Sequence, residues 1–232
     1  MSRKLRKNGE SELRRSPCFE NLESRHLLSG NPIISEFMAS NESTLRDNAF
    51  PRRFSDWIEI YNSGDEAMDL AGWHLTDRPN NLNKWTFPSV ILPAEGFLHV
   101  FASGNDVPDG SGNLHTNFSL DREGEYLALV QPDGTSLASE FGSTDADYPE
   151  QFSDVSYGLT QELAPGGAIN TLEDQLRYFQ TPTPGEPNIP GSRDLGPIIS
   201  ATTHTPDVPD FGEDVVVSAM VREGAGTLRT RP

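Results

Sequence analysis

The sequence predicts an all-β protein in which two sheets pack face to face, and three observations support this. The 232-residue chain contains 20 Gly and 18 Pro, residues that turns use and helix interiors exclude. About eight or nine short runs of β-type apolar alternation follow one another, separated by turn-forming clusters. Several runs are apolar on both faces near their centres, which is typical of strands covered by a second sheet.

The clearest strand is DWIEIYN, residues 56–62, which a first strand in residues 31–40 (NPIISEFMAS) precedes. Side chains alternate between the two faces of a strand. One face of 56–62 therefore carries Trp57, Glu59 and Tyr61. The other face carries Ile58 and Ile60.

Seven further strands are predicted, each bounded by Gly, Pro, Asn, Asp or Ser. They are residues 70–77 (LAGWHLTD), 83–93 (NKWTFPSVILP), 96–103 (GFLHVFAS), 114–120 (LHTNFSL), 124–131 (GEYLALVQ), 135–141 (TSLASEF) and 154–158 (DVSYG). The turn PDG joins 124–131 and 135–141 as a hairpin. Pro88 and Pro93 restrict 83–93 to a sheet edge or a bend. Residues 170–179 (NTLEDQLRYF) are compatible with one or two helical turns.

The three tryptophans are predicted to be structural. Trp57, Trp73 and Trp85 are interpreted as core residues, or as plugs at one end of the sandwich. Each contributes roughly 1.5–3 kcal/mol or more when buried. The core must supply the stability, because Cys18 is the only cysteine and an intrachain disulfide needs two.

The chain divides by composition into four parts. Residues 1–30 form a basic leader, predicted to be disordered, and 31–180 form the β-sandwich. Residues 181–197 (TPTPGEPNIPGSRDLGP) are a Pro/Gly-rich linker, semi-rigid by composition. Residues 198–232 begin a second β-unit with one clear strand, 215–221. A complete fibronectin-like or immunoglobulin-like unit needs about seven strands, so we expect a fragment, or a truncated or frame-shifted gene.

The charge is strongly acidic and unevenly distributed. The first 30 residues carry seven Lys/Arg and four Glu, a net charge of +3, whereas residues 31–232 carry 11 basic and 31 acidic residues, a net charge of −20. Such a body repels phosphate backbones, which argues against nucleic-acid binding. The acidity is compatible with a soluble or halotolerant surface, or with divalent-cation binding. The sequence has neither an ordinary signal peptide nor an apolar run long enough for a membrane-spanning helix.

Several motifs in sequence order resemble the lamin-tail domain, an immunoglobulin-like β-sandwich. The motifs are residues 34–36 (ISE), 56–62, 70–77, 85–88 (WTFP) and 96–98 (GFL). Three later stretches resemble the bacterial branch of the family: 114–134, 148–158 and 177–188. The resemblance covers about residues 31–190 and implies an immunoglobulin-like sandwich.

Two flanking stretches carry resemblances of their own. Residues 19–30 (FENLESRHLLSG) resemble the LEPR-xLL motif of large bacterial envelope and exported proteins, with Ser24 in place of the motif's proline. The alternative is a basic leader without such a role. Residues 196–221 are similar to the first strands of fibronectin-like units that follow lamin-tail domains in such proteins.

No catalytic constellation is present in the sequence. The five histidines are scattered, without HExxH or metal-ligand spacing: His26, His74, His99, His115 and His204. There is no G-x-S-x-G elbow, and Cys18 lies in the leader, far from any predicted histidine partner. We therefore predict no catalytic and no cofactor-binding residues, and a protein that is not an enzyme.

Calcium is the one ligand for which the sequence offers candidates. Residues 105–113 fail the EF-hand pattern, because Leu114 and Leu120 stand where glycine and glutamate are needed. Residues 143–154 carry four carboxylates on a predicted loop: Asp145, Asp147, Glu150 and Asp154. Asp145, Asp147 and Asp154 are the candidate calcium ligands, and the alternative is a solvated acidic loop.

Together these features predict a non-catalytic binding or tethering module of a large bacterial envelope or extracellular protein. Its partner would be a protein or glycan of the cell envelope, contacted through exposed β-edges or loops. The alternative is the amino-terminal accessory part of an enzyme, a kinase or hydrolase, whose catalytic domain lies outside this chain. Export to the envelope or the exterior is expected, with a cytoplasmic location as the alternative.

Overall fold

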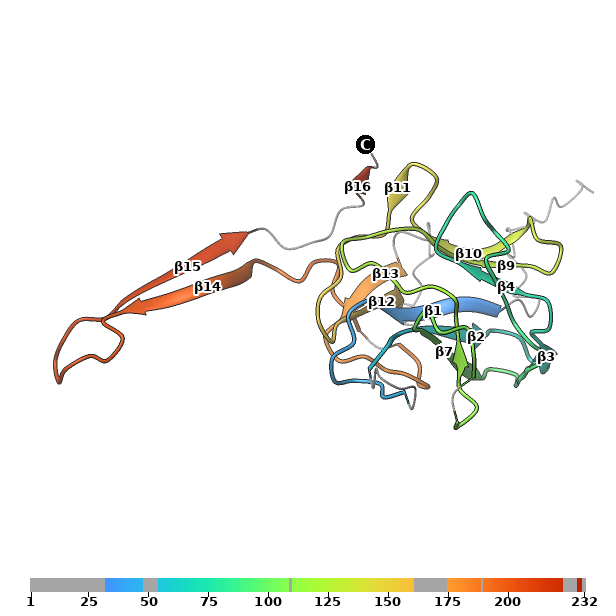
Figure 1. Ribbon diagram of the computed structural model, residues 1–232, viewed down its shortest axis with the longest axis horizontal. Coiled ribbons are helices and arrows are strands. Elements are labelled where there is room, and N and C mark those ends of the chain that lie inside the picture. The colour runs from blue at the N-terminus through green and yellow to red at the C-terminus, as the bar shows by residue number, and fades with distance from the viewer. Residues whose placement is uncertain are drawn as a thin grey trace, which may run out of the picture.

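A computed structural model describes residues 32–47, 54–108, 110–160, 175–188, 190–222 and 229–230. The described chain is built of strands that form a two-sheet body, from which a long hairpin projects (Figure 1). The strands of the body are β1 (Pro32–Met38), β2 (Asp56–Asn62), β3 (Met68–Asp69), β4 (His74–Thr76), β5 (Trp85–Thr86), β6 (Ile91–Leu92), β7 (Phe97–Ala102), β8 (Leu114–His115), β9 (Leu127–Val130), β10 (Leu137–Phe141), β11 (Ala146–Asp147), β12 (Ser156–Leu159) and β13 (Leu176–Phe179). The hairpin is β14 (Ile198–Thr205) and β15 (Val216–Arg222), and β16 (Arg229–Thr230) follows it.

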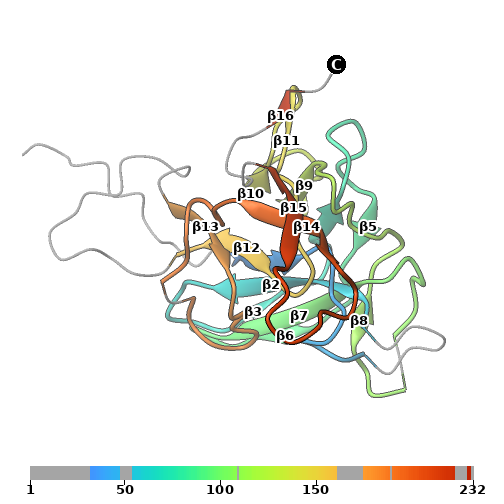
Figure 2. The same cartoon turned by 90° about the vertical axis from the view of Figure 1, so that its left-hand side faces the viewer.

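The body is a sandwich of a six-stranded and a four-stranded sheet. The larger sheet has the order β13-β12-β1-β2-β7-β8, and the smaller one the order β10-β9-β4-β5. All neighbours pair antiparallel except β7 and β8, which are parallel. Figure 2 shows strands of the two sheets stacked one above the other. The predicted all-β sandwich is confirmed.

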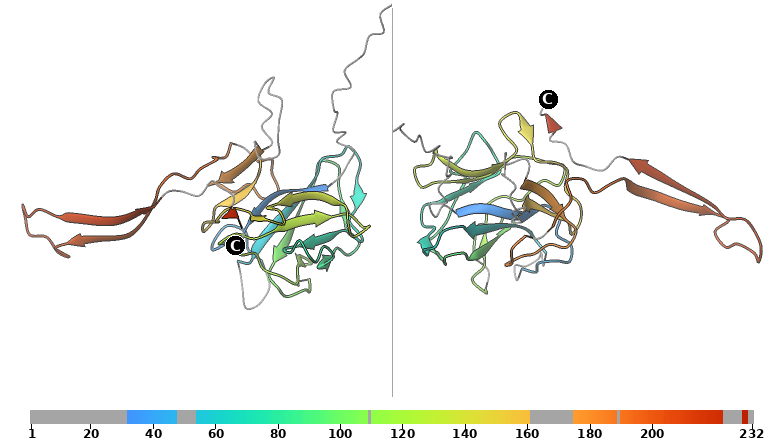
Figure 3. Two further views of the ribbon diagram at one scale, coloured as in Figure 1. Left: turned by 90° about the horizontal axis from the view of Figure 1, so that it is seen from above. Right: turned by 180° about the vertical axis from the view of Figure 1, so that it is seen from behind.

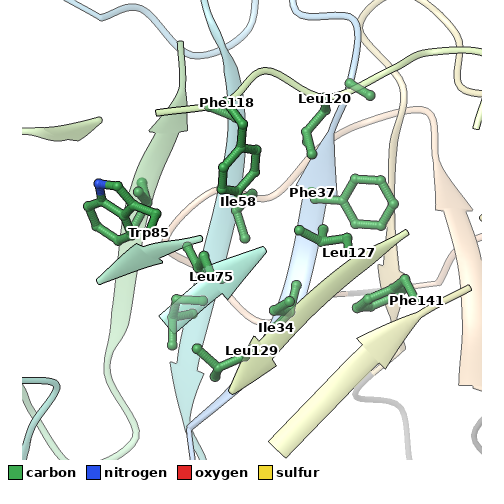
Figure 4. Close-up of a cluster of buried hydrophobic side chains, with 14 of the residues drawn as sticks. Ile34, Phe37, Ile58, Leu75, Trp85, Phe118, Leu120, Leu127, Leu129 and Phe141 are labelled. Atoms are coloured by element: carbon green, nitrogen blue, oxygen red, sulfur yellow. The ribbon is translucent and has the colours of Figure 1, made fainter. Parts of the chain in front are cut away.

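Alternating apolar side chains from both sheets fill the space between them. Ile34, Phe37 and Ile58 of the larger sheet meet Leu127 and Leu129 of the smaller one, and all five are fully buried (Figure 4). Aromatic rings close the core at the β12 side, where Phe37 lies 5.1 Å from Phe141 and 4.8 Å from Tyr148 between ring centroids. Trp73 and Trp85 belong to the same core cluster.

Trp57 lies on the opposite face of the larger sheet. It is fully buried there in a second cluster with Met38 and Phe101, and Leu45 packs against them. The outer face of this sheet is therefore covered as well. Trp57 is a core residue as predicted, but of a separate, outer core.

A bulge at Ser35 changes which side chains of β1 face outward. Ile34 pairs with Ile60 and Glu36 with Glu59, so Ser35 is the extra residue. Ser35 and Glu36 consequently lie on the same, outer side, while Ile34 and Phe37 face the core. Opposite the bulge, only glycine fits at position 158, because a Cβ there would lie 2.2 Å from the Ser35 carbonyl oxygen.

Two predicted elements differ in the structure. Residues 176–179, considered for a helical turn, form β13, which pairs with β12 at the edge of the larger sheet. The helical prediction is wrong for these residues, because backbone pairing with β12 outweighs a short helix of low intrinsic stability. Residues 83–93 give two strands, β5 and β6, which pair with different partners on either side of Pro88.

The β14–β15 hairpin extends away from the body (Figures 1 and 3). Its strands pair with each other only, while β16 returns to pair with β11. The predicted strand 215–221 is observed as β15, one residue later. The leader, residues 1–30, lies outside the described residues, and the predicted division into four parts stays a prediction.

Candidate functional site

The most unusual polar feature is a pair of buried glutamates on the outer face of the larger sheet. Glu36 of β1 and Glu59 of β2 are paired in register and are both 0% exposed. Both side chains point away from the core, as the strand alternation requires. A buried carboxyl group must find hydrogen-bond partners or stay protonated.

Glu59 is surrounded by hydrogen-bond donors. The Ser35 hydroxyl donates to its Oε1 at 2.6 Å, and the Gly185 amide donates to its Oε2 at 2.6 Å. His99 Nε2 on β7 lies 2.9 Å from the same Oε2.

Glu36 has a different environment. Its Oε1 accepts hydrogen bonds from the Ser156 hydroxyl and from the Thr183 amide, the latter at 3.3 Å. Its Oε2 lies 3.3 Å from the Thr183 hydroxyl oxygen. The pKa of Glu36 is raised to about 7, chiefly by burial and also by the charge of Glu59, while the hydrogen bonds from Ser156 and Thr183 oppose the shift.

The segment that covers these carboxyl groups is residues 183–188, which we name the clasp. It begins with a turn in which the Glu186 amide donates to the Thr183 carbonyl at 2.9 Å. Gly185 has a φ of +85°, which together with proline before it defines a type II turn. Asn188 anchors the far end, since its Nδ2 donates to the carbonyls of Ser35 and Leu159, each at 2.9 Å. The predicted linker thus contains residues packed on the sandwich.

A half-buried carboxyl group with a raised pKa, Glu125, lies just before β9 of the opposite sheet. Burial raises the pKa of Glu125 to about 7, against the hydrogen bond from the Asp121 amide. Glu125 borders an open cavity of about 510 Å³, lined also by Asp77, Arg78, Gly124, Thr144 and Asp147. Asp77 is paired with Lys84 Nζ at 2.5 Å. This cavity is acidic and widely open to solvent.

The three candidate calcium ligands occupy two different structural settings. Asp147 lies in β11 beside the open cavity, and Asp145 precedes it. Asp154 instead fixes the loop at 42–43: its Oδ1 accepts the amides of Glu42 and Ser43 at 2.8 and 2.9 Å. Within the described ranges, no three His, Cys, Asp or Glu side chains lie close enough to hold a metal ion. Calcium binding stays a prediction that this arrangement does not favour.

The histidines of the described chain serve structural contacts. His74 Nδ1 lies 2.9 Å from the Thr86 hydroxyl, and burial lowers its pKa. His115 is buried, lies 2.8 Å from the Ser103 hydroxyl and stacks on Phe101. His204 Nδ1 lies 3.0 Å from the Pro206 carbonyl oxygen. His26 and Cys18 are outside the described residues.

Most of the large apolar side chains that are exposed in the described chain lie in the hairpin and its loop. Ile199, Val217 and Val221 share one face by the pairing register, and are 62%, 70% and 62% exposed. On the other face, Val216 and Met220 are 65% and 62% exposed. The connecting loop adds Phe211, which is fully exposed, and four acidic residues: Asp207, Asp210, Glu213 and Asp214. No other part of the described chain covers either hairpin face.

The burial of Glu36 and Glu59 was not predicted from the sequence. Glu59 was placed correctly on the face that carries Trp57, but an acidic residue in an alternating strand normally indicates a solvent face. The signal that was available is Trp57 itself, since a tryptophan on the same face indicates that this face is covered. For Glu36 the alternation in β1 gives no such signal, because the bulge at Ser35 interrupts the alternation of faces along the strand.

The comparison with protein families agrees with this architecture. The lamin tail domain family matches residues 28–144, and the chain belongs to this family. The lamin tail domain is a non-enzymatic immunoglobulin-like domain of the protein-interaction type. The matched residues end before β12 and β13, which the structure adds to the larger sheet. No curated protein and no solved structure matches the chain significantly. Among the described residues, no helix has the length and apolar character needed to cross a membrane.

Proposed function

We propose that the chain is a non-catalytic binding or tethering module of a larger bacterial protein that works in the cell envelope or outside the cell. The observation that carries this proposal is the exposed apolar surface of the β14–β15 hairpin. Large exposed apolar patches mark interaction surfaces, because isolated soluble domains avoid them. The family assignment supports the same class of function.

The hairpin chemistry favours a protein partner over a glycan. Ile199, Val217 and Val221 form an aliphatic strip with few hydrogen-bonding groups, whereas sugars present many hydroxyls. Both hairpin edges also offer unpaired backbone groups, which a strand of a partner can extend. We therefore assign the hairpin to a protein that supplies a β-strand or sheet.

The negative charge of the loop indicates what kind of protein surface can bind the hairpin. Residues 206–215 carry four carboxylates and no Lys or Arg, and they join the two apolar strands at the tip. A complementary surface is apolar in its centre and bordered by Lys or Arg. Binding to such a surface is faster at low ionic strength, and added salt weakens it.

The test uses the immobilised full chain and an extract of bacterial cell envelope. We expect retention of a protein by the wild type, and a loss of at least about tenfold with Val217→Lys/Val221→Lys, which places two charges on the apolar strip. The control is Ile91→Lys, because Ile91 is 62% exposed but lies in β6 of the body.

The retained protein must then be purified and titrated against the full chain by itself. A dissociation constant that rises with salt and with the hairpin variant supports the proposal. Retention that is unchanged in the variant, or a retained species that is a glycan, contradicts it. Turnover of substrates from a broad hydrolase panel by the purified chain would overturn the non-catalytic assignment.

A further inference from the structure

The hydrogen bonds around Glu36 link its protonation state to the clasp. Asn188 Nδ2 uses both of its hydrogens on the Ser35 and Leu159 carbonyls, which only accept. Its Oδ1 therefore faces Thr183, whose hydroxyl oxygen lies 2.9 Å away. Oδ1 is an acceptor only, and at 2.9 Å it is the nearer of two oxygens to which the Thr183 hydroxyl can donate its single proton, the other being Glu36 Oε2 at 3.3 Å.

The same hydroxyl oxygen also lies 3.3 Å from Glu36 Oε2. With its only proton committed to Asn188, Thr183 can take part in this second hydrogen bond only as the acceptor. With a proton on its carboxyl group Glu36 can donate this hydrogen bond, whereas an ionised Glu36 competes with Asn188 for the Thr183 proton. Glu59 differs in its partners: the Ser35 hydroxyl and the Gly185 amide donate to its two oxygens, and His99 Nε2 lies 2.9 Å from Oε2.

We propose that residues 183–188 are a pH-sensitive clasp, closed on the sheet while Glu36 is protonated and loosened when Glu36 ionises. Ionisation removes the proton that links Glu36 to Thr183 and places a second negative charge beside Glu59. The Thr183 hydroxyl then serves either Glu36 or Asn188, but not both. This inference concerns the body of the domain and does not depend on the proposed hairpin function.

The charged groups at this site are few. Glu36 comes from β1, Glu59 from β2 and His99 from β7, while β12 contributes the neutral Ser156. Arg177 of β13 lies in the same row as Glu36, beyond Gly158, and its Nη1 donates to the Leu176 carbonyl oxygen at 2.6 Å. In the clasp, Thr183 and Asn188 do not titrate, and the side chain of Glu186 is exposed. Burial raises the pKa of Glu36 to about 7. A group with a raised pKa stabilises the closed form below that pKa and ceases to do so as the pH rises through it.

Amide hydrogen exchange of the full chain between pH 6 and 8.5 tests the clasp. The reporters are the amides of Thr183 and Gly185, which donate to Glu36 and Glu59. After correction for the intrinsic pH dependence of exchange, their protection should fall above pH 7 by up to about tenfold per pH unit, the limit for a single proton. The amides of Val100 and Leu129 in the core report global unfolding and should not follow this course.

The decisive variant is Glu36→Gln, whose amide can donate to Thr183 and accept from Ser156 at any pH. We expect its clasp protection to be high and independent of pH. The matched control is Glu125→Gln, which removes a half-buried carboxyl group with a similarly raised pKa beside the other sheet and should keep the wild-type fall. An equal fall in Glu36→Gln, or constant protection in the wild type, contradicts the proposal.

A second measurement needs no variant. The ¹³C shift of the Glu36 carboxyl in the wild-type chain should titrate with a midpoint near pH 7. Even if Glu36→Gln fails to fold, this measurement decides the question. A midpoint below about pH 5, close to that of an ordinary glutamate, shows that Glu36 is ionised in the closed clasp and overturns the proposal.

Discussion

The body and the hairpin use the same strand pattern with opposite results for burial. Ile58 and Ile60 of β2 are fully buried, whereas Val217 and Val221 of β15 are 70% and 62% exposed. Both strands alternate and both pair antiparallel with a neighbour. The difference is the second layer, which covers β2 on both faces and is lacking around β15 in the described chain. Alternation of apolar and polar residues thus specifies a strand. The apolar side chains of that strand stabilise the fold only where a second layer buries them.

The largest effect is expected where the second layer is densest. Phe37→Ala removes a ring that contacts Phe141, Tyr148 and Tyr157, and should lower the free energy of unfolding by about 3–5 kcal/mol. Val217→Ala on the hairpin should change it by less than about 0.5 kcal/mol. Chemical denaturation measures both. Similar losses in the two variants would mean that the hairpin contributes to the same cooperative unit, against the comparison above.

The next effect concerns pH, because the described carboxyl groups with raised pKa values lie in the body. Glu36 and Glu125 have pKa values raised to about 7. Their contribution to stability is complete below the ordinary glutamate pKa and is lost as the pH rises to about 7. We expect the free energy of unfolding to fall by roughly 1–3 kcal/mol per carboxyl over this range. The variant Glu36→Gln/Glu125→Gln should flatten this part of the profile in denaturation at fixed pH.

At pH values below the ordinary glutamate pKa, the free energy of unfolding should instead fall as the pH is lowered. Hydrogen bonds from Ser136 and Thr135 lower the pKa of Asp133 to about 2, and hydrogen bonds from the loop at 42–43 lower that of Asp154. Their stabilisation is lost as the pH falls through these lowered values. Stability should therefore be greatest near pH 4–5, between the two losses. If stability were greatest at pH 8 or above, the raised pKa values of Glu36 and Glu125 would be contradicted.

A comparable effect is expected at the close contact of β1 and β12. Gly158→Ala places a methyl group against the Ser35 carbonyl and should destabilise the body by about 1–3 kcal/mol. Gly110→Ala is the control, because nothing lies within 4 Å of a Cβ at that position. Equal stability of the two variants in thermal unfolding would show that the bulge at Ser35 can relax.

The smallest effect concerns the loop anchored by Asp154. Asp154→Ala removes the acceptor for the amides of Glu42 and Ser43 and should cost about 0.5–2 kcal/mol, as the loss of a helix cap does. Asp154→Asn should retain most of the stability, since asparagine tolerates the φ of +58° at this position. Calcium added to the wild type distinguishes a ligand from an anchor: a rise in melting temperature that Asp154→Asn abolishes would identify a ligand.

The sequence predicted the sandwich because its signal is local. The alternation in residues 56–62 and the aromatic spacing at Trp85 and Phe87 report strand and face directly. The clasp was taken for a linker because the groups that order it are distant: Thr183 and Glu36 are 147 positions apart. Local composition carries no information on such contacts. β13 was missed for the same reason, since its order comes from pairing with β12.

The burial of Glu36 and Glu59 could not be predicted from local sequence either. A strand with Glu at alternate positions indicates a solvent face, and this rule fails when a later segment returns to cover that face. Gly185 and Asn188 do so here, through backbone and side-chain hydrogen bonds that no periodicity encodes.

The tight bend at Thr183–Glu186 has a consequence for kinetics. Proline at its second position and glycine at its third pre-set the backbone, so the detached peptide keeps much of its bound shape. When the clasp binds the sheet again, few torsion angles have to be ordered and the loss of conformational entropy is small. Binding should therefore be as fast as the diffusion of a short tethered chain. Relaxation after a pH jump should therefore occur in microseconds or less, long before the sheets beneath can rearrange.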